Sequence, residues 1–168
     1  MKHLLVILLA SLFLFSCKNN LPQPANSDFA GTWRLLSRID KTKDGKIIPE
    51  ASLGSDPIAI LFYDPKGNMS VQIMRRTRND NTVIISASQD SGNSSAFNGY
   101  DAYFGTYLID TLNHLVKHRI QGAIDPKDIG KELIRNYSFS GDTLLLWFNT
   151  LNANVKVTRT VTWVKELK

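Results

Sequence analysis

The sequence contains little cysteine and histidine, with one cysteine and three histidines among 168 residues. A single cysteine excludes a disulfide within the chain and a zinc site built on paired cysteines. The excess of charge is also small. There are 20 Lys and Arg against 15 Asp and Glu, a formal net charge of +5, and no segment is strongly basic. We therefore expect no nucleic-acid partner.

Motifs of common enzyme classes are also missing. The chain has no Gly-x-Ser-x-Gly elbow, no phosphate loop and no dinucleotide fingerprint, so we predict no catalytic residues and no cofactor. His114 and His118 would lie about 13 Å apart on a strand, too far to share one metal ion, so no metal site is predicted. Carboxylates from distant strands can still meet without leaving a sequence pattern.

The N-terminus has the pattern of an export signal. Residues 4–15 are almost purely apolar, the length of a secretory signal and short of the ~20 residues that span a bilayer. The segment Leu14–Cys17 resembles a bacterial lipobox, where the chain is cut before the cysteine and the thiol is acylated. We predict a lipoprotein signal peptide at 1–16 and a lipidated, polar tether at 17–28.

Palmitate-like acyl chains on Cys17 would anchor the protein to a membrane of the bacterial cell envelope, with the outer membrane favoured. The alternative is an ordinary signal peptide in which this cysteine occurs by chance.

The whole chain is 43% hydrophobic, and from residue 29 onward alternating apolar segments predict one mainly β domain over 29–168. The predicted strands are Gly31–Asp40, Ile58–Asp64, Met69–Thr77, Phe104–Asp110, His114–Gly122, Lys131–Ser140, Thr143–Asn149 and Val157–Lys165. Short turns favour antiparallel hairpins, so the eight strands predict a closed up-and-down barrel. An open sheet or a two-sheet sandwich is the alternative.

One short helix is predicted around Phe97–Phe104. Phe97, Tyr100 and Phe104 recur at helical spacing, behind serines that can cap a helix. These aromatic residues alternatively form a plain packing face.

Four stretches together resemble the bacterial lipocalin-like domain family: Gly31–Ser37, Tyr63–Arg75, Ala96–Tyr107 and Ser140–Leu144. The third is the most specific, because a generic barrel does not require it. The resemblance implies an eight-stranded calycin-type barrel over most of residues 30–165 and no defined reaction. One departure is that the family tends to carry two adjacent histidines where this chain has His118-Arg119.

Within this resemblance, Trp33 is similar to the lipocalin tryptophan that closes one end of the barrel. Arg159, on the last predicted strand, is the arginine expected to stack on its ring. Along the first strand, alternation places Trp33, Leu35, Ser37 and Ile39 inside and Arg34, Leu36, Arg38 and Asp40 outside.

The same alternation turns several charged side chains inward. The predicted ligand-binding residues are Arg75, Tyr107, His118, Arg135, Tyr137 and Phe139. A buried guanidinium needs a partner or a wet cavity, so the predicted ligand is a small hydrophobic or amphiphilic molecule with an acidic group. Alternatively, the alternation is misread, or these arginines reach water at the rim.

Three functions are compatible with these sequence features. The first is a membrane-anchored protein that binds a small ligand within the barrel, and the second is a structural or protein-interaction module with a filled barrel. The interior volume separates them, since a ligand cavity holds ~300 Å³ or more. The third is an isomerase or hydrolase that uses His118 as acid or base, with Tyr107 or Tyr137 as hydrogen-bond donors.

Overall fold

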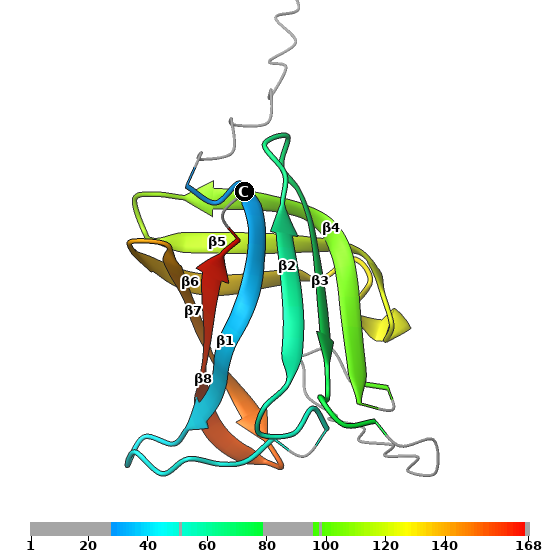
Figure 1. The fold of residues 1–168 in the computed structure, drawn as a ribbon, viewed down its shortest axis with the longest axis vertical. Coiled ribbons are helices and arrows are strands. Elements are labelled where there is room, and N and C mark those ends of the chain that lie inside the picture. The colour runs from blue at the N-terminus through cyan, green and yellow to red at the C-terminus, as the bar shows by residue number, and fades with distance from the viewer. Residues whose placement is uncertain (1–27, 51, 79–95, 98, 167–168) are drawn as a thin grey trace, which may run out of the picture.

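In a computed structural model that describes residues 28–50, 52–78, 96–97 and 99–166, the chain forms one closed antiparallel barrel (Figure 1). Its strands are β1 (Gly31–Lys41), β2 (Ile58–Tyr63), β3 (Asn68–Met74), β4 (Tyr100–Asp110), β5 (Leu115–Ala123), β6 (Glu132–Ser140), β7 (Thr143–Asn152) and β8 (Val155–Lys165). Each strand pairs with the next, and β8 pairs with β1. The predicted eight-stranded up-and-down barrel is confirmed.

The hairpin turns form where turn residues stand in the sequence. Between β2 and β3, the Asp64 carboxylate accepts hydrogen bonds from the backbone N–H of Lys66 and of Asn68, both at 2.8 Å. Gly67 in the same turn has φ 91°, a conformation that disfavours residues with a Cβ. The turn therefore fixes the register in which β2 meets β3.

The predicted helix around Phe97–Phe104 is wrong. Tyr100 already belongs to β4, and Phe97 forms an isolated antiparallel bridge with Tyr100. Gly99, at φ 71°, interrupts any helical path, and pairing with β3 satisfies the backbone of the residues that follow. The spacing of the aromatic side chains is a weaker influence than this backbone pairing.

Helix is nearly absent from the described part of the chain, where a single 3₁₀ turn, η1 (Pro126–Asp128), follows β5. No helix among the described residues is both long and apolar enough to cross a membrane.

A β-bulge between Leu35 and Ser37 changes which residues of β1 face the interior. Alternation holds as far as Leu35, but Ile39 beyond the bulge is 39% exposed, whereas Asp40 is 3% exposed. The predicted inward positions of Ser37 and Ile39, and the outward positions of Arg38 and Asp40, are therefore wrong. One extra residue reverses the alternation of everything after it.

An aromatic core fills the end of the barrel where the chain enters. Phe29 is fully buried, and its ring lies 4.8 to 6.3 Å, between centroids, from those of Tyr63, Tyr107, Tyr137 and Phe139.

Trp33 is buried beside this core, and its Nε1 donates to the Phe29 carbonyl at 2.8 Å. The cation near its ring is Lys165, with Nζ 5.2 Å from the centroid. The expected stacking of Arg159 on Trp33 is wrong, because Arg159 is held by Asp40 instead.

Candidate functional site

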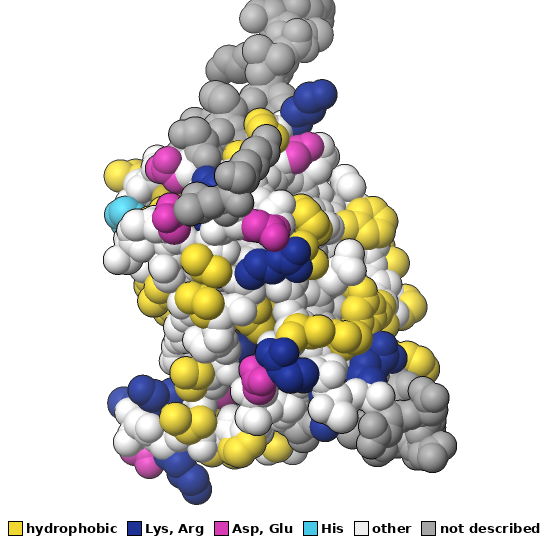
Figure 2. Space-filling model, viewed as in Figure 1, with side chains coloured by type: hydrophobic (Ala, Val, Ile, Leu, Met, Phe, Trp, Pro, Cys, Tyr) yellow, Lys and Arg dark blue, Asp and Glu magenta, His cyan; other side chains and the backbone are white. Residues whose placement is uncertain are grey.

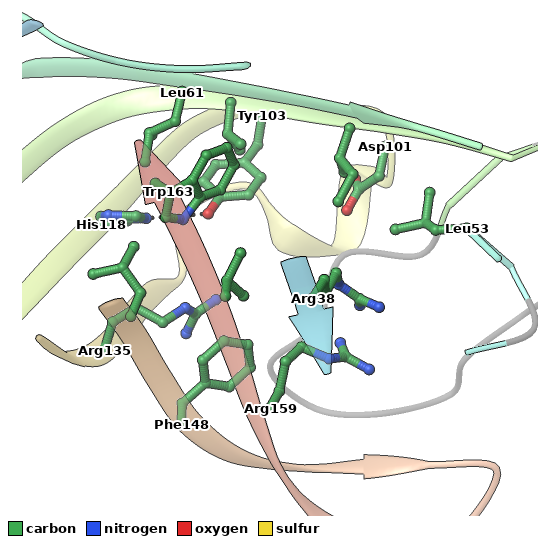
Figure 3. Close-up of a pocket in the computed structure, with 14 residues that line it drawn as sticks. Arg38, Leu53, Leu61, Asp101, Tyr103, His118, Arg135, Phe148, Arg159 and Trp163 are labelled. Atoms are coloured by element: carbon green, nitrogen blue, oxygen red, sulfur yellow. Dashed lines mark hydrogen bonds between the residues drawn. The ribbon is translucent and has the colours of Figure 1, made fainter. Parts of the chain in front are cut away.

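The interior of the barrel contains a partly open cavity of about 80 Å³ (Figure 3). Its apolar wall includes Leu53, Leu61, Val71, Ile73, Leu146 and Val161, and its polar groups belong to Arg38, Asp101, Tyr103, His118, Arg135, Arg159 and Trp163. The cavity is larger than the ~10–15 Å³ that one water needs. It is smaller than the ~300 Å³ expected to separate a ligand-binding barrel from a filled one, so the volume alone favours the filled barrel and excludes a whole fatty acid.

Arg135 extends from β6 into this cavity and is 8% exposed. Its guanidinium carbon lies 3.7 Å from the centroid of the Phe148 ring. One guanidinium nitrogen donates to the Ile134 carbonyl at 3.1 Å, and the group is also hydrogen-bonded to the Tyr103 hydroxyl. Burial lowers the pKa of Arg135, but an arginine stays charged in proteins.

The other two arginines that line the cavity are paired with acids. Arg159 donates to both carboxylate oxygens of Asp40, at 2.7 and 2.6 Å, and Asn152 donates to the same carboxylate at 2.8 Å. Arg38 donates to Glu50 at 2.7 Å. Among the described residues, no carboxylate oxygen lies within 4.0 Å of a nitrogen of Arg135.

His118 lies between two tyrosine hydroxyls. Its Nε2 is 2.6 Å from the Tyr63 oxygen, and its Nδ1 is 3.1 Å from the Tyr103 oxygen. Burial, and then repulsion by Arg135, lower the pKa of His118 to about 3, so the imidazole is neutral at physiological pH. Burial also raises the pKa of Tyr103 to about 12. The chain Tyr63–His118–Tyr103–Arg135 is thus a fixed hydrogen-bonded network, with no group that titrates near neutral pH.

Trp163 on β8 contributes a buried donor to the same cavity. Its Nε1 has no hydrogen-bond partner within the described residues. Figure 3 shows Trp163, Tyr103 and His118 on one side of the view, opposite Arg135 and Phe148. The cavity therefore presents N–H donors, a stacked guanidinium and an apolar wall.

The structure brings together only part of the predicted ligand-binding set. His118 and Arg135 line the cavity, whereas Tyr107, Tyr137 and Phe139 belong to the aromatic core around Phe29.

Arg75 follows the end of β3, and its guanidinium donates to the Ser52 carbonyl at 2.8 Å. Tyr107 donates to the Asp64 carbonyl at 2.8 Å. Tyr107 and Tyr137 do not line the cavity that His118 lines, so the structure does not bring together the three residues considered for acid–base chemistry. Cys17 lies outside the described residues.

The predicted set lacked Tyr103, Phe148 and Trp163, the three aromatic residues that line the cavity together with His118. Alternation along Val157–Lys165 already turns Trp163 inward, and alternation from Leu144 through Leu146 reaches Phe148 in the same way. Tyr103 was missed because it was placed in the predicted helix. No three His, Cys, Asp or Glu side chains gather as metal ligands would anywhere in the described ranges.

A comparison with protein families matches residues 30–166 to the lipocalin-like domain. The chain belongs to this family. Such lipocalin-like barrels are generally associated with the binding of small hydrophobic ligands.

Among solved structures, the chain is similar to a lipoprotein, YedD, from Klebsiella pneumoniae. The two are 12% identical, the match covers 86% of this chain and 79% of that chain, and the TM-score is 0.38, too low to bear on function. No curated protein matches the chain.

Proposed function

We propose that this lipocalin-like protein binds a small amphiphilic molecule with an acidic group in the barrel cavity. We also propose that lipid on Cys17 holds it to a membrane of the bacterial envelope. One observation supports the ligand above all others: Arg135 is a buried cation in a cavity, and no described carboxylate pairs with it.

A buried charge without a counterion is costly, and a ligand carboxylate would offset that cost through charge-assisted hydrogen bonds. Phe148 covers one face of the guanidinium, which leaves N–H groups at its edge to meet a ligand. Leu61 and Val71 line the same cavity and offer apolar contact to the rest of the molecule.

The volume sets the size of this ligand. An apolar cavity of ~150 Å³ holds benzene, whereas this cavity is about 80 Å³ and partly open, so we propose that the acidic group lies inside and the short apolar part extends toward the opening. A short-chain carboxylate such as butyrate is therefore a suitable probe.

Binding of butyrate and of 1-butanol to the purified full-length protein tests the proposal. Arg135→Met keeps most of the side-chain bulk and removes the charge. It should weaken butyrate binding by at least about 30-fold and 1-butanol binding by less than about threefold, because only butyrate uses the charge. Arg119→Met is the matched control, since Arg119 is exposed on β5 and pairs with Glu132. Calorimetry or an NMR titration measures both ligands, and equal losses for the two would contradict the proposal.

Two observations favour a second function, a protein-interaction module with a filled barrel. Side chains fill the interior except for the cavity of about 80 Å³, and a groove of about 300 Å³ lies over β3, β4 and β5, beside the 56% exposed side chain of Phe104. Figure 2 shows hydrophobic side chains exposed on the face drawn there, with Lys and Arg scattered among them. If the wild-type protein binds neither butyrate nor 1-butanol, the ligand-binding function is contradicted and the protein-interaction module is favoured.

A further inference from the structure

We infer that the Trp163 indole N–H is a second ligand contact, so that the cavity recognises an ionised monocarboxylate through Trp163 together with Arg135. This inference rests on the proposed function and adds to it a second residue that recognises the carboxylate.

The first support is the environment of the indole. Trp163 is 4% exposed and lines the same cavity as Arg135, and its Nε1 has no hydrogen-bond partner within the described residues. Buried polar groups are nearly always hydrogen-bonded, and each exception calls for a physical explanation. Trp33 provides the contrast within this barrel, since its equally buried Nε1 donates to the Phe29 carbonyl at 2.8 Å.

The second support is the kind of polar group near Arg135. Arginine and tryptophan side chains only donate hydrogen bonds. The Tyr103 hydroxyl is already engaged by His118 and by Arg135. Asp101 also lines the cavity, and its charge acts on Arg38 and on Tyr103. Figure 3 shows Asp101 on the other side of the view from Arg135 and His118. The Arg135 side of the cavity is therefore rich in donors.

A donor-rich site selects a ligand group that only accepts. A carboxylate offers two accepting oxygens, one for the guanidinium and one for the indole, and no N–H or O–H of its own. A primary amide has the same shape but carries an NH₂ group, which would face the donors of Arg135 or Trp163. Butyrate should therefore bind more tightly than butyramide, a nearly isosteric neutral molecule.

The experiment is a titration of the purified full-length protein, ¹⁵N-labelled, with butyrate and with butyramide. The chain has three tryptophans, and Trp163→Phe assigns the Trp163 indole N–H signal. Butyrate should move this signal downfield until the site is saturated and leave that of Trp33 in place. Trp163→Phe should weaken butyrate binding about tenfold, whereas Trp147→Phe, which changes a tryptophan outside the cavity lining, should not.

The outcomes separate this inference from the proposed function. If butyrate binds in an Arg135-dependent way and the Trp163 signal does not move, the indole contact is wrong and the proposed function stands. If butyramide binds as tightly as butyrate, the acidic ligand of the proposed function is wrong, and this inference fails with it. If butyrate does not bind to the wild-type protein at all, both proposals fail.

Discussion

At the scale of single residues, burial has a large effect on the protonation of His118. Each of its two ring nitrogens is hydrogen-bonded to a tyrosine hydroxyl, one to Tyr63 and one to Tyr103. Burial keeps the imidazole neutral in this position. The pKa of His118 is about 3 in the folded protein, against 6.5 for an unperturbed histidine. Below pH 6.5 the unfolded chain therefore binds a proton that the folded barrel does not bind.

The sign of the pH dependence follows from this difference. The contribution of His118 to stability is most favourable above pH 6.5 and becomes less favourable as the pH falls toward about 3. His118 alone should lower the free energy of unfolding by about 2 kcal/mol between pH 7 and pH 5. In His118→Gln this part of the pH dependence should disappear, as measured by urea unfolding at both pH values. His114→Gln controls for the loss of an imidazole. An unchanged difference between pH 7 and pH 5 in His118→Gln would contradict the assignment.

At the scale of elements, the bulge in β1 decides which charges enter the barrel. It turns Asp40 toward Arg159 and leaves Ile39 at the surface. Asp40→Asn should cost about 3–5 kcal/mol, because it leaves the buried Arg159 without its counterion. Ile39→Asn, one residue earlier, should cost less than about 1 kcal/mol. Urea unfolding of the two variants compares them directly, and the reverse order would show that β1 alternates without a bulge.

The strands and the bulge differ in how far the sequence predicts them. Alternation and turn residues locate all eight strands, since both are local properties of the chain. The bulge depends on how β1 meets β8, a pairing between distant residues that leaves no local pattern. For the same reason Arg135 and His118 could be predicted as cavity residues, whereas the pairing of Asp40 with Arg159 could not.

The helix around Phe97 is an error of another kind. Helical spacing of aromatic residues is a weak preference when a neighbouring strand can satisfy the backbone, and β3 does so for Tyr100 and the residues after it. Because Tyr103 was placed in that helix, the cavity residue that links His118 to Arg135 was missed.

At the scale of the whole molecule, the barrel's first strand begins at Gly31, and the proposed attachment point, Cys17, precedes it in the sequence. Cys17→Ser should release the protein from the membrane fraction or leave its signal peptide uncleaved, because the only thiol that can carry acyl chains is gone. Membrane fractionation with mass spectrometry of the N-terminus measures both effects. A variant that still sediments with membranes and still carries acyl chains would contradict the lipid anchor.

The burial of Phe29 has a mechanical consequence. With Cys17 anchored as proposed, a pull from the membrane reaches the barrel through Phe29, which is wedged among four aromatic rings. Two hydrogen bonds brace the same point, from Trp33 Nε1 to the Phe29 carbonyl and from Lys165 Nζ to the Asp28 carbonyl. After Phe29, β1 is hydrogen-bonded to β2 on one side and to β8 on the other. A pull along β1 would therefore be shared by the hydrogen bonds to both neighbouring strands, and the closed barrel has no edge strand that could separate first.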